Sequence, residues 1–318
     1  ALALKMSVDV ISTKDGTPQK VVYYQPETTA KNLAGPAVPL LVFLHSWSGS
    51  IEQAPSLVGL AKHRGWVMIA PAFRGINNHP EACASDLASQ DIVDAVEYAK
   101  SHARIDTDRI YLVGGSGGGH MSLVMAARAP DLWAGVSAWV PISDLTAWHA
   151  ESTARKNNYA KMIEQCCGGK PGPATEAEYR HRSPLFHLAA AKGVPLDINT
   201  GIHDGHTGSV PVSHSLLAFN VLAAPDKQVS VADIDFMVRE QKIPTALAAE
   251  TQNDPERQKA TLFRRASGNA RVTVFEGGHD SEPSAALEWL SRQRKGQPAD
   301  WSLGQKPGKA GPALELSK

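Results

Sequence analysis

Short, almost continuously apolar runs alternate with helical patterns along the chain. Residues 39–45 and 66–71 are runs of this kind, which is typical of strands buried on both faces of a sheet. Apolar positions at helical spacing follow over residues 86–103. Further strands are predicted at 109–113, 133–140, 194–200 and 271–275, and further helices at 53–63, 117–128, 213–222, 231–240 and 283–294. This alternation predicts an α/β fold whose mostly parallel central sheet carries helices on both faces.

The chain before the first buried run has a different pattern. Residues 6–12 and 19–25 alternate apolar and polar positions around the turn signal Asp15-Gly16, and they predict an antiparallel hairpin. With the loop that follows, this hairpin occupies residues 1–37. We expect it to belong to a single domain that spans residues 1–295.

Two later segments lack a clear period. Residues 142–192 are interrupted by glycine and proline, and we interpret them as a helical, lid-like insertion over one edge of the sheet. Residues 296–318 are rich in glycine, proline and lysine, which predicts a C-terminal tail.

Composition narrows the kinds of partner. Lys and Arg together number 32, as do Asp and Glu, so the formal net charge of the 318 residues is zero. A neutral chain argues against partners such as nucleic acid or an anionic membrane. No run of 18 apolar residues is present, so no membrane span is expected. The first residue is Ala1 rather than Met, which would fit removal of a signal peptide and favours a secreted or periplasmic location over a cytoplasmic one.

The three cysteines are Cys83, Cys166 and Cys167. They lack the spacing of metal ligands, so neither a metal nor another cofactor is expected. A disulfide from Cys83 to Cys166 or to Cys167 would form only in an oxidising compartment. Three buried thiols are the alternative.

Five glycines surround one serine in the sequence Gly-Gly-Ser-Gly-Gly-Gly at residues 114–119. A predicted strand precedes this segment and a predicted helix follows it, which is the context of a nucleophile elbow. Such a turn is strained and tolerates little beyond glycine beside the serine. A dinucleotide-binding loop is the alternative, but the acidic residue that should follow about 20 positions later is missing from the pattern. The sequence therefore predicts Ser116 as a nucleophile.

Two residues at later strand ends complete a Ser-His-Asp arrangement. Asp204 follows the strand at 194–200, and His279 follows the last strand through two glycines. The order Ser, Asp, His is the one expected when these groups lie at the carboxyl ends of strands in this architecture. We expect His279 to be the general base and Asp204 to orient it. Asp144 is the rival acid, although it is better placed as a helix N-cap.

An oxyanion hole needs two backbone N–H groups. We expect one from Gly117 and the other from Trp47, with Ser46 as the alternative. The Trp47 ring could also form a wall for substrate or simply pack. Trp148 and His206 are further candidates for contact with substrate.

These residues resemble an α/β-hydrolase, and most closely the catalytic domain of prolyl-oligopeptidase-like serine hydrolases. The resemblance covers about residues 38–292 and is carried by Leu44-His45, residues 70–75, residues 114–118, residues 182–185, Val210-Pro211 and Gly278-His279. It implies an α/β-hydrolase fold and acyl transfer to water through an acyl-enzyme. The usual His-Gly-Gly loop is His45-Ser46-Trp47 here, and the segment after Asp204 is longer than usual.

The Ser-His-Asp arrangement indicates the type of reaction but does not identify the substrate. About 40 residues precede the first core strand, too few for the propeller that screens peptides in such peptidases. An open site favours a carboxylesterase acting on small or carbohydrate-linked esters, for example acetyl or feruloyl esters. The alternative is a small-peptide serine peptidase or amidase. A non-catalytic binding protein on a hydrolase scaffold is the third class.

Overall fold

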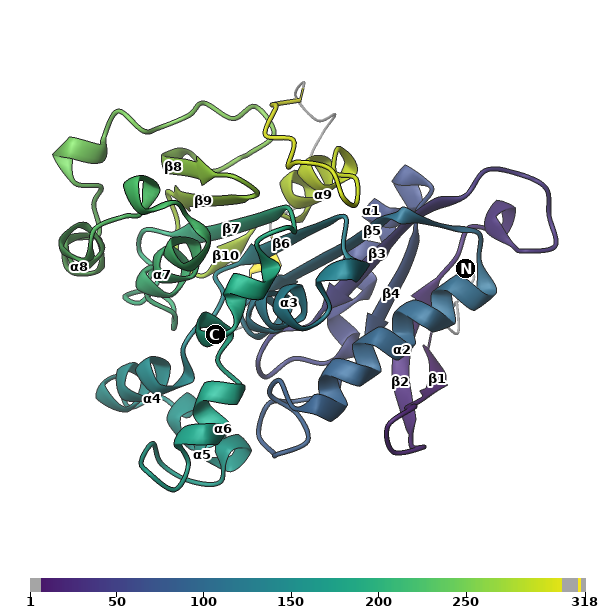
Figure 1. The fold of residues 1–318 in the computed structure, drawn as a ribbon, viewed down its shortest axis with the longest axis horizontal. Helices are drawn as coiled ribbons and strands as arrows, with labels where there is room; N and C mark the ends of the chain where they lie inside the picture. Colours follow the sequence, from purple (N-terminus) through teal and green to yellow (C-terminus); the bar gives the residue numbers. More distant parts are fainter. Residues whose placement is uncertain (1–6, 305–313, 316–318) are drawn as a thin grey trace.

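The computed structural model describes residues 7–304 and the backbone of residues 314 and 315. Nine of the described strands form one sheet in the order β1-β2-β4-β3-β5-β6-β7-β9-β8 (Figure 1). Their bounds are β1 Ser7–Ile11, β2 Pro18–Tyr24, β3 Val38–Leu44, β4 Val67–Pro71, β5 Ile105–Gly115, β6 Gly135–Trp139, β7 Leu196–Gly201, β8 Thr261–Ser267 and β9 Ala270–Phe275. The six strands from β4 to β9 in this order are parallel. The predicted α/β class and mostly parallel sheet are confirmed.

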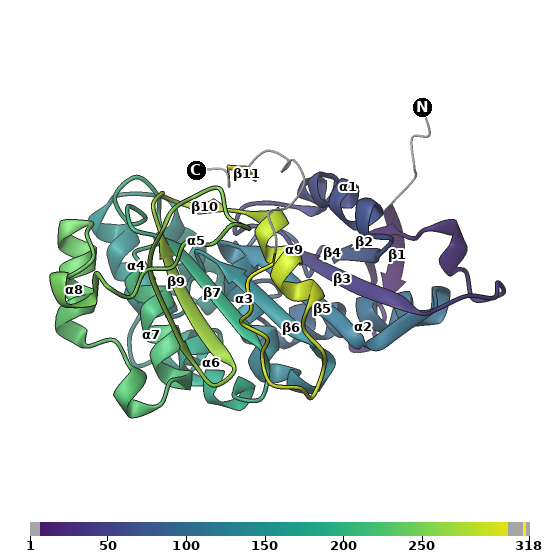
Figure 2. The same cartoon turned by 90° about the horizontal axis from the view of Figure 1, so that it is seen from above.

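Helices cover both faces of this sheet. The helices α2 Asp86–His102, α3 Gly117–Arg128, α7 Ser213–Leu222 and α8 Val231–Glu240 lie on one face, and α1 Pro55–Arg64 and α9 Pro283–Ser291 lie on the other (Figure 2). Each face has its own apolar core, one built around Leu40, Val42 and Leu112 and the other around Leu41, Phe43 and Tyr111. Successive residues of β3 and β5 point to opposite cores, which is why these strands read as continuously apolar.

The sheet has an antiparallel strand pair at each edge, and the apolar pattern of the sequence predicted one of the two. The hairpin of β1 and β2 is observed, with Gly16 at φ 73° in the turn. The strand β8 at the opposite edge was not predicted. It pairs antiparallel with β9, and Arg264 and Arg265 break its apolar alternation.

The predicted insertion is helical. Its main helices are α4 Leu145–Ala154, α5 Tyr159–Cys167 and α6 Glu176–His181. They form a third apolar cluster with Trp47, which lies in the loop after β3. The insertion therefore packs against the carboxyl ends of the parallel strands.

The boundary predicted at residue 295 is wrong for the residues that follow it directly. The Trp301 ring stacks on Trp289 of α9 with 5.3 Å between centroids, and the Trp289 indole donates to the Asp300 carbonyl at 3.1 Å. The domain thus extends to at least Gly304, because the contact of the partly buried Trp301 ring with α9 outweighs the glycine-rich and proline-rich composition. Residues 305–313 and 316–318 of the predicted tail lie outside the described residues. The strand β11, Leu314–Glu315, pairs with β10, Asp280–Ser281.

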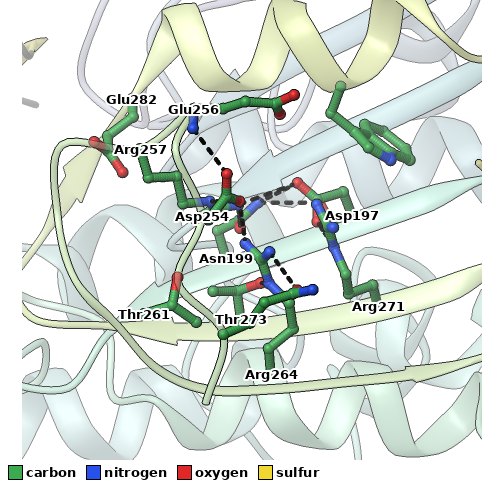
Figure 3. Close-up of polar contacts among 12 residues, drawn as sticks. Asp197, Asn199, Asp254, Glu256, Arg257, Thr261, Arg264, Arg271, Thr273 and Glu282 are labelled. Atoms are coloured by element: carbon green, nitrogen blue, oxygen red, sulfur yellow. Dashed lines mark hydrogen bonds and ion pairs between the residues drawn. The ribbon is translucent and has the colours of Figure 1, made fainter. Parts of the chain in front are cut away.

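A buried ionic cluster lies between β7, β9, β8 and the loop at 251–260 (Figure 3). Arg271 donates to Asp197 at 2.8 Å, and Arg264 pairs with Asp254 at 2.9 Å. The guanidinium of Arg257 lies between the two carboxylates, 3.7 Å from Asp197 and 3.4 Å from Asp254. Burial alone would raise the pKa of Asp197, but the neighbouring arginines lower it to about 2. Both carboxylates stay ionised, and they hold the loop at 251–260 against the sheet.

The same loop braces the segment that follows β9. The Glu282 carboxylate accepts the backbone N–H of Gln258 at 2.6 Å and that of Lys259 at 3.1 Å. The Lys259 ammonium pairs with Asp280 at 3.0 Å. Asp280 and Glu282 lie one and three residues after His279, so the buried cluster supports the loop that carries the predicted base.

Candidate active site

Ser116 occupies the turn between β5 and α3 in the conformation of a nucleophile elbow. Its backbone has φ 56° and ψ −119°, a combination that L-residues rarely adopt. The Ser116 N–H donates to the Trp139 carbonyl at 2.8 Å, which ties the turn to β6. A Cβ on Gly118 would lie 2.1 Å from the Leu44 carbonyl oxygen, so only glycine allows α3 to approach β3 this closely.

Asp204 and His279 form a hydrogen-bonded pair. They follow β7 and β9, which are neighbouring parallel strands, and His279 Nδ1 lies 2.7 Å from Asp204 Oδ2. The other Asp204 oxygen accepts the N–H groups of Gly205 at 2.9 Å and Val210 at 3.0 Å. An acceptor-only carboxylate on Nδ1 selects the tautomer whose Nε2 accepts a proton. Among residues 7–304, His279 Nε2 makes no hydrogen bond, whereas Nδ1 bonds to Asp204.

The structure brings Asp204 and His279 together but shows no hydrogen bond from Ser116 to His279 among the described residues. β6 and β7 separate β5 from β9 in the sheet, and Ser281 and Pro283, which follow His279, line one cavity together with Gly114 and Gly115 of β5. The Ser116 side chain also has no other hydrogen-bond partner there, and the residue is 5 % exposed. Catalytic hydrogen bonds are often open without substrate and tighten when it binds.

Asp144, the rival acid, is a helix cap. Its carboxylate accepts the N–H groups of Thr146 at 2.9 Å and Ala147 at 3.3 Å at the start of α4. Its side chain is therefore committed to the helix N-terminus.

Two backbone N–H groups lie side by side next to Ser116. A Cβ on Gly117 would approach the Trp47 nitrogen to 2.3 Å, so the two backbones are in direct contact. The Ser46 N–H already donates to the Gln53 side chain at 2.9 Å, whereas the Trp47 N–H has no acceptor in the described part of the chain. Trp47 and Gly117 are thus the pair that could bind an oxyanion, and Ser46 is not.

A family model for the prolyl oligopeptidase family matches residues 59–239 of the chain. The chain belongs to the prolyl oligopeptidase family. The matched range contains Ser116 and Asp204, and the chain is a serine hydrolase of the α/β-hydrolase superfamily.

One curated protein is similar to the chain in sequence, and solved structures share its fold. The uncharacterized peptidase YtmA of Bacillus subtilis (strain 168) is 27% identical over 157 residues, which are 48% of this chain and 57% of that protein. The acylaminoacyl peptidase of Pyrococcus horikoshii superposes with a TM-score of 0.59 at 17% identity over 91% of this chain and 41% of its own. A puromycin hydrolase superposes with a TM-score of 0.60 at 16% identity over 90% and 38%. The chain thus spans less than two thirds of each of these proteins.

Trp47 and Trp148 pack against each other instead of offering a wall to substrate. Their ring centroids are 4.8 Å apart, the Trp148 ring also packs at a tilt on the Tyr159 ring at 4.8 Å, and the two tryptophans are 1 % and 0 % exposed. The Trp148 indole donates to the Ser209 carbonyl at 2.8 Å. Of the two interpretations of Trp47, the structure supports packing, and Trp148 packs in the same buried cluster.

His206 braces its own loop. Its Nε2 lies 2.6 Å from the Val238 carbonyl of α8, which accounts for the ring without substrate. Of the two interpretations of this residue, the structure supports the bracing role.

Gln53 is a site residue that the sequence reasoning missed. Its amide oxygen accepts the Ser46 N–H and its amide nitrogen donates to the Ser46 hydroxyl, both at 2.9 Å. His45 holds the same loop, with ring nitrogens 2.8 Å from the Ser46 carbonyl and 2.9 Å from the Ala72 carbonyl. Burial lowers the pKa of His45. A polar residue at the start of a helix is ordinary in a sequence, so no local signal marks Gln53.

The cysteines and the charged residues show no metal site. Cys83, Cys166 and Cys167 are free and buried, and the Cys83 and Cys166 thiols hydrogen-bond to each other. Burial raises the pKa of the Cys83 thiol. Among the residues that the structure describes, no group of three or more His, Cys, Asp or Glu could hold a metal ion, and no helix is long and apolar enough to cross a membrane.

His120 of α3 is fully buried. Its Nε2 lies 2.8 Å from the Arg182 carbonyl, which fixes it as the N–H donor. Burial lowers the pKa of His120 to about 4. The folded protein therefore keeps this ring neutral at pH values where the unfolded chain takes up a proton.

Acid is expected to destabilise the fold through this ring. The unfolded ring binds a proton below about pH 6.5 and the folded ring only below about pH 4, so stability falls as the pH drops through this window. Between pH 7 and pH 5 the loss through His120 is about 2 kcal/mol of unfolding free energy. Urea unfolding at both pH values measures it. His120→Gln should reduce the difference, exposed His63→Gln should not, and an unchanged difference in His120→Gln would contradict the assignment.

Proposed function

We propose that the protein is a serine peptidase or amidase that cleaves small acyl amides through Ser116, His279 and Asp204. The observation that carries the proposal is the family match, which spans more than half of the chain and includes the elbow. The printed names of the relatives point the same way, since they describe a peptidase, an acylaminoacyl peptidase and a puromycin hydrolase. They favour the peptidase alternative over the carboxylesterase that the sequence suggested. No relative named above is described as an esterase of carbohydrates.

The geometry suits acyl transfer from an amide or an ester to water. In the proposed reaction the Ser116 Oγ attacks the substrate carbonyl, and His279 Nε2 takes up the hydroxyl proton. The N–H groups of Trp47 and Gly117 bind the oxygen that becomes negative. An amine is a poor leaving group unless it is protonated, and the imidazolium next to Asp204 supplies that proton. Water then attacks the acyl-enzyme with the same base.

A matched substrate pair tests the proposal. The rates kcat/KM are measured on an N-acylated amino acid as its p-nitroanilide and as its p-nitrophenyl ester. We expect both to be hydrolysed, with both activities lost in Ser116→Ala. Hydrolysis of the ester alone would establish an esterase.

A fluorophosphonate probe tests catalysis independently of the substrate. The native protein should be labelled, and Ser116→Ala should not. If the native protein is neither labelled nor active on either substrate, the third class, a binding protein on a hydrolase scaffold, would replace the proposal.

A further inference from the structure

A cavity of about 260 Å³ lies behind the elbow, on the face of the sheet that carries α1 and α9. Its backbone floor is Gly114 and Gly115, which immediately precede Ser116. Its walls are mostly apolar and come from the strands β3, β5 and β6 and from both helices: Phe43, Val113, Trp139, Leu57 and Pro283. An engineered apolar cavity of about 150 Å³ binds benzene, so this one has room for an aromatic ring and its linking atoms.

Two residues that line the cavity belong to segments that also support the site. Gln53 lines it and also holds the Ser46 backbone and hydroxyl, so one wall is shared with the loop that presents the Trp47 N–H. Ser281 of β10, two residues after His279, also lines the cavity. The elements α1, α9 and β10 lie together on this side of the sheet (Figure 2).

The region of the site under the insertion is occupied by packed aromatic side chains. Trp47 and Trp148 are 1 % and 0 % exposed, and their rings pack with Tyr159 under the insertion. A bulky substrate group therefore finds no room between those three rings. The side that carries α1 and α9 has a formed apolar cavity.

We infer that this cavity binds an aromatic or large apolar side chain on the leaving-group side of the substrate, which rests on the proposed function. His279 must deliver its proton to the leaving atom, so the leaving group lies against the loop that follows His279. Ser281 and Pro283 of that loop line the cavity. The protein thus prefers substrates whose leaving amine carries a benzyl-like group over those whose leaving amine carries none.

Two substrate series with one common acyl group test the inference. The amide series compares a phenylalaninamide with a glycinamide leaving group, and the ester series compares benzyl with methyl alcohol. In each pair we expect kcat/KM to be at least about 10-fold higher for the aromatic leaving group, which is the usual range for filling an apolar pocket. No preference in either series would overturn the inference. If only the esters are hydrolysed but benzyl is preferred, the peptidase proposal fails and the pocket stands.

A cavity-filling variant gives the second readout. Ser56 is exposed at the cavity rim on α1, where its hydroxyl donates to the Gln53 carbonyl at 2.6 Å, and Ser56→Trp should place a large ring in the cavity from this exposed position. It should abolish most of the aromatic preference, so that the ratio of kcat/KM between the aromatic and the small leaving group falls to less than about 3-fold in both series. Lys62→Trp, at an exposed position on the same helix that does not line the cavity, is the matched control and should keep the preference. A preference that survives in Ser56→Trp would overturn the inference.

Discussion

Replacing Ser116 with alanine is expected to lower kcat/KM by about 10⁴- to 10⁶-fold, the range seen when a serine hydrolase loses its nucleophile. The remaining rate would come from substrate binding and from the N–H groups of Trp47 and Gly117. Hydrolysis of an activated ester measures the loss, with the fluorophosphonate as a second readout. Alanine keeps the Cβ in the strained turn, so the melting temperature should change little.

Ser122 provides the control for this variant. It lies within α3, is buried, and donates its hydroxyl to the Gly118 carbonyl at 2.7 Å. Ser122→Ala removes one neutral hydrogen bond near the elbow and should leave kcat/KM within a few-fold of the native value. If Ser122→Ala were as inactive as Ser116→Ala, loss of structure at the elbow would explain both.

Replacing Asp204 with asparagine is expected to lower kcat by about 10⁴-fold, because an amide N–H facing His279 Nδ1 selects the tautomer whose Nε2 carries the proton. In this structure the substitution should affect the hydrogen bond to His279 and leave the other hydrogen bonds of this side chain in place. The asparagine oxygen can still accept the N–H groups of Gly205 and Val210, so the loop keeps its support. Steady-state kinetics at neutral pH measure the effect.

Asp144→Asn is the matched control for the acid. An asparagine is also a good N-cap, so α4 should keep its two capping bonds and activity should stay near the native value. If Asp144→Asn lost activity and Asp204→Asn kept it, the assignment of the orienting carboxylate would be wrong.

Local sequence predicted the strands and the elbow well, since both depend on neighbours in the chain. The runs at 39–45 and 66–71 became β3 and β4 because each of their residues packs into one of two cores. The helices α7 and α8 have the predicted bounds. The glycines beside Ser116 were informative because the turn excludes side chains whatever the distant contacts are.

Errors arose where distant contacts outweigh local pattern. β8 carries two arginines, and Arg264 is tolerated at the sheet edge because Asp254 pairs with it. Residues 296–304 have the composition of a tail, yet Trp301 stacks on Trp289 and holds them on the domain. Neither partner could be deduced from the segment itself.

The sequence by itself determined the α/β class, the elbow and the order of Ser116, Asp204 and His279, because each of these rests on a local pattern and on strand ends that meet at one edge of a parallel sheet. Only the tertiary structure decided which acid pairs with His279, which N–H beside the elbow is free, and on which side of the site there is room for substrate. These depend on side chains that meet across the fold: Asp204 with His279, Gln53 with Ser46, and Trp47 with Trp148. These contacts are set by packing across the fold and not by spacing along the chain.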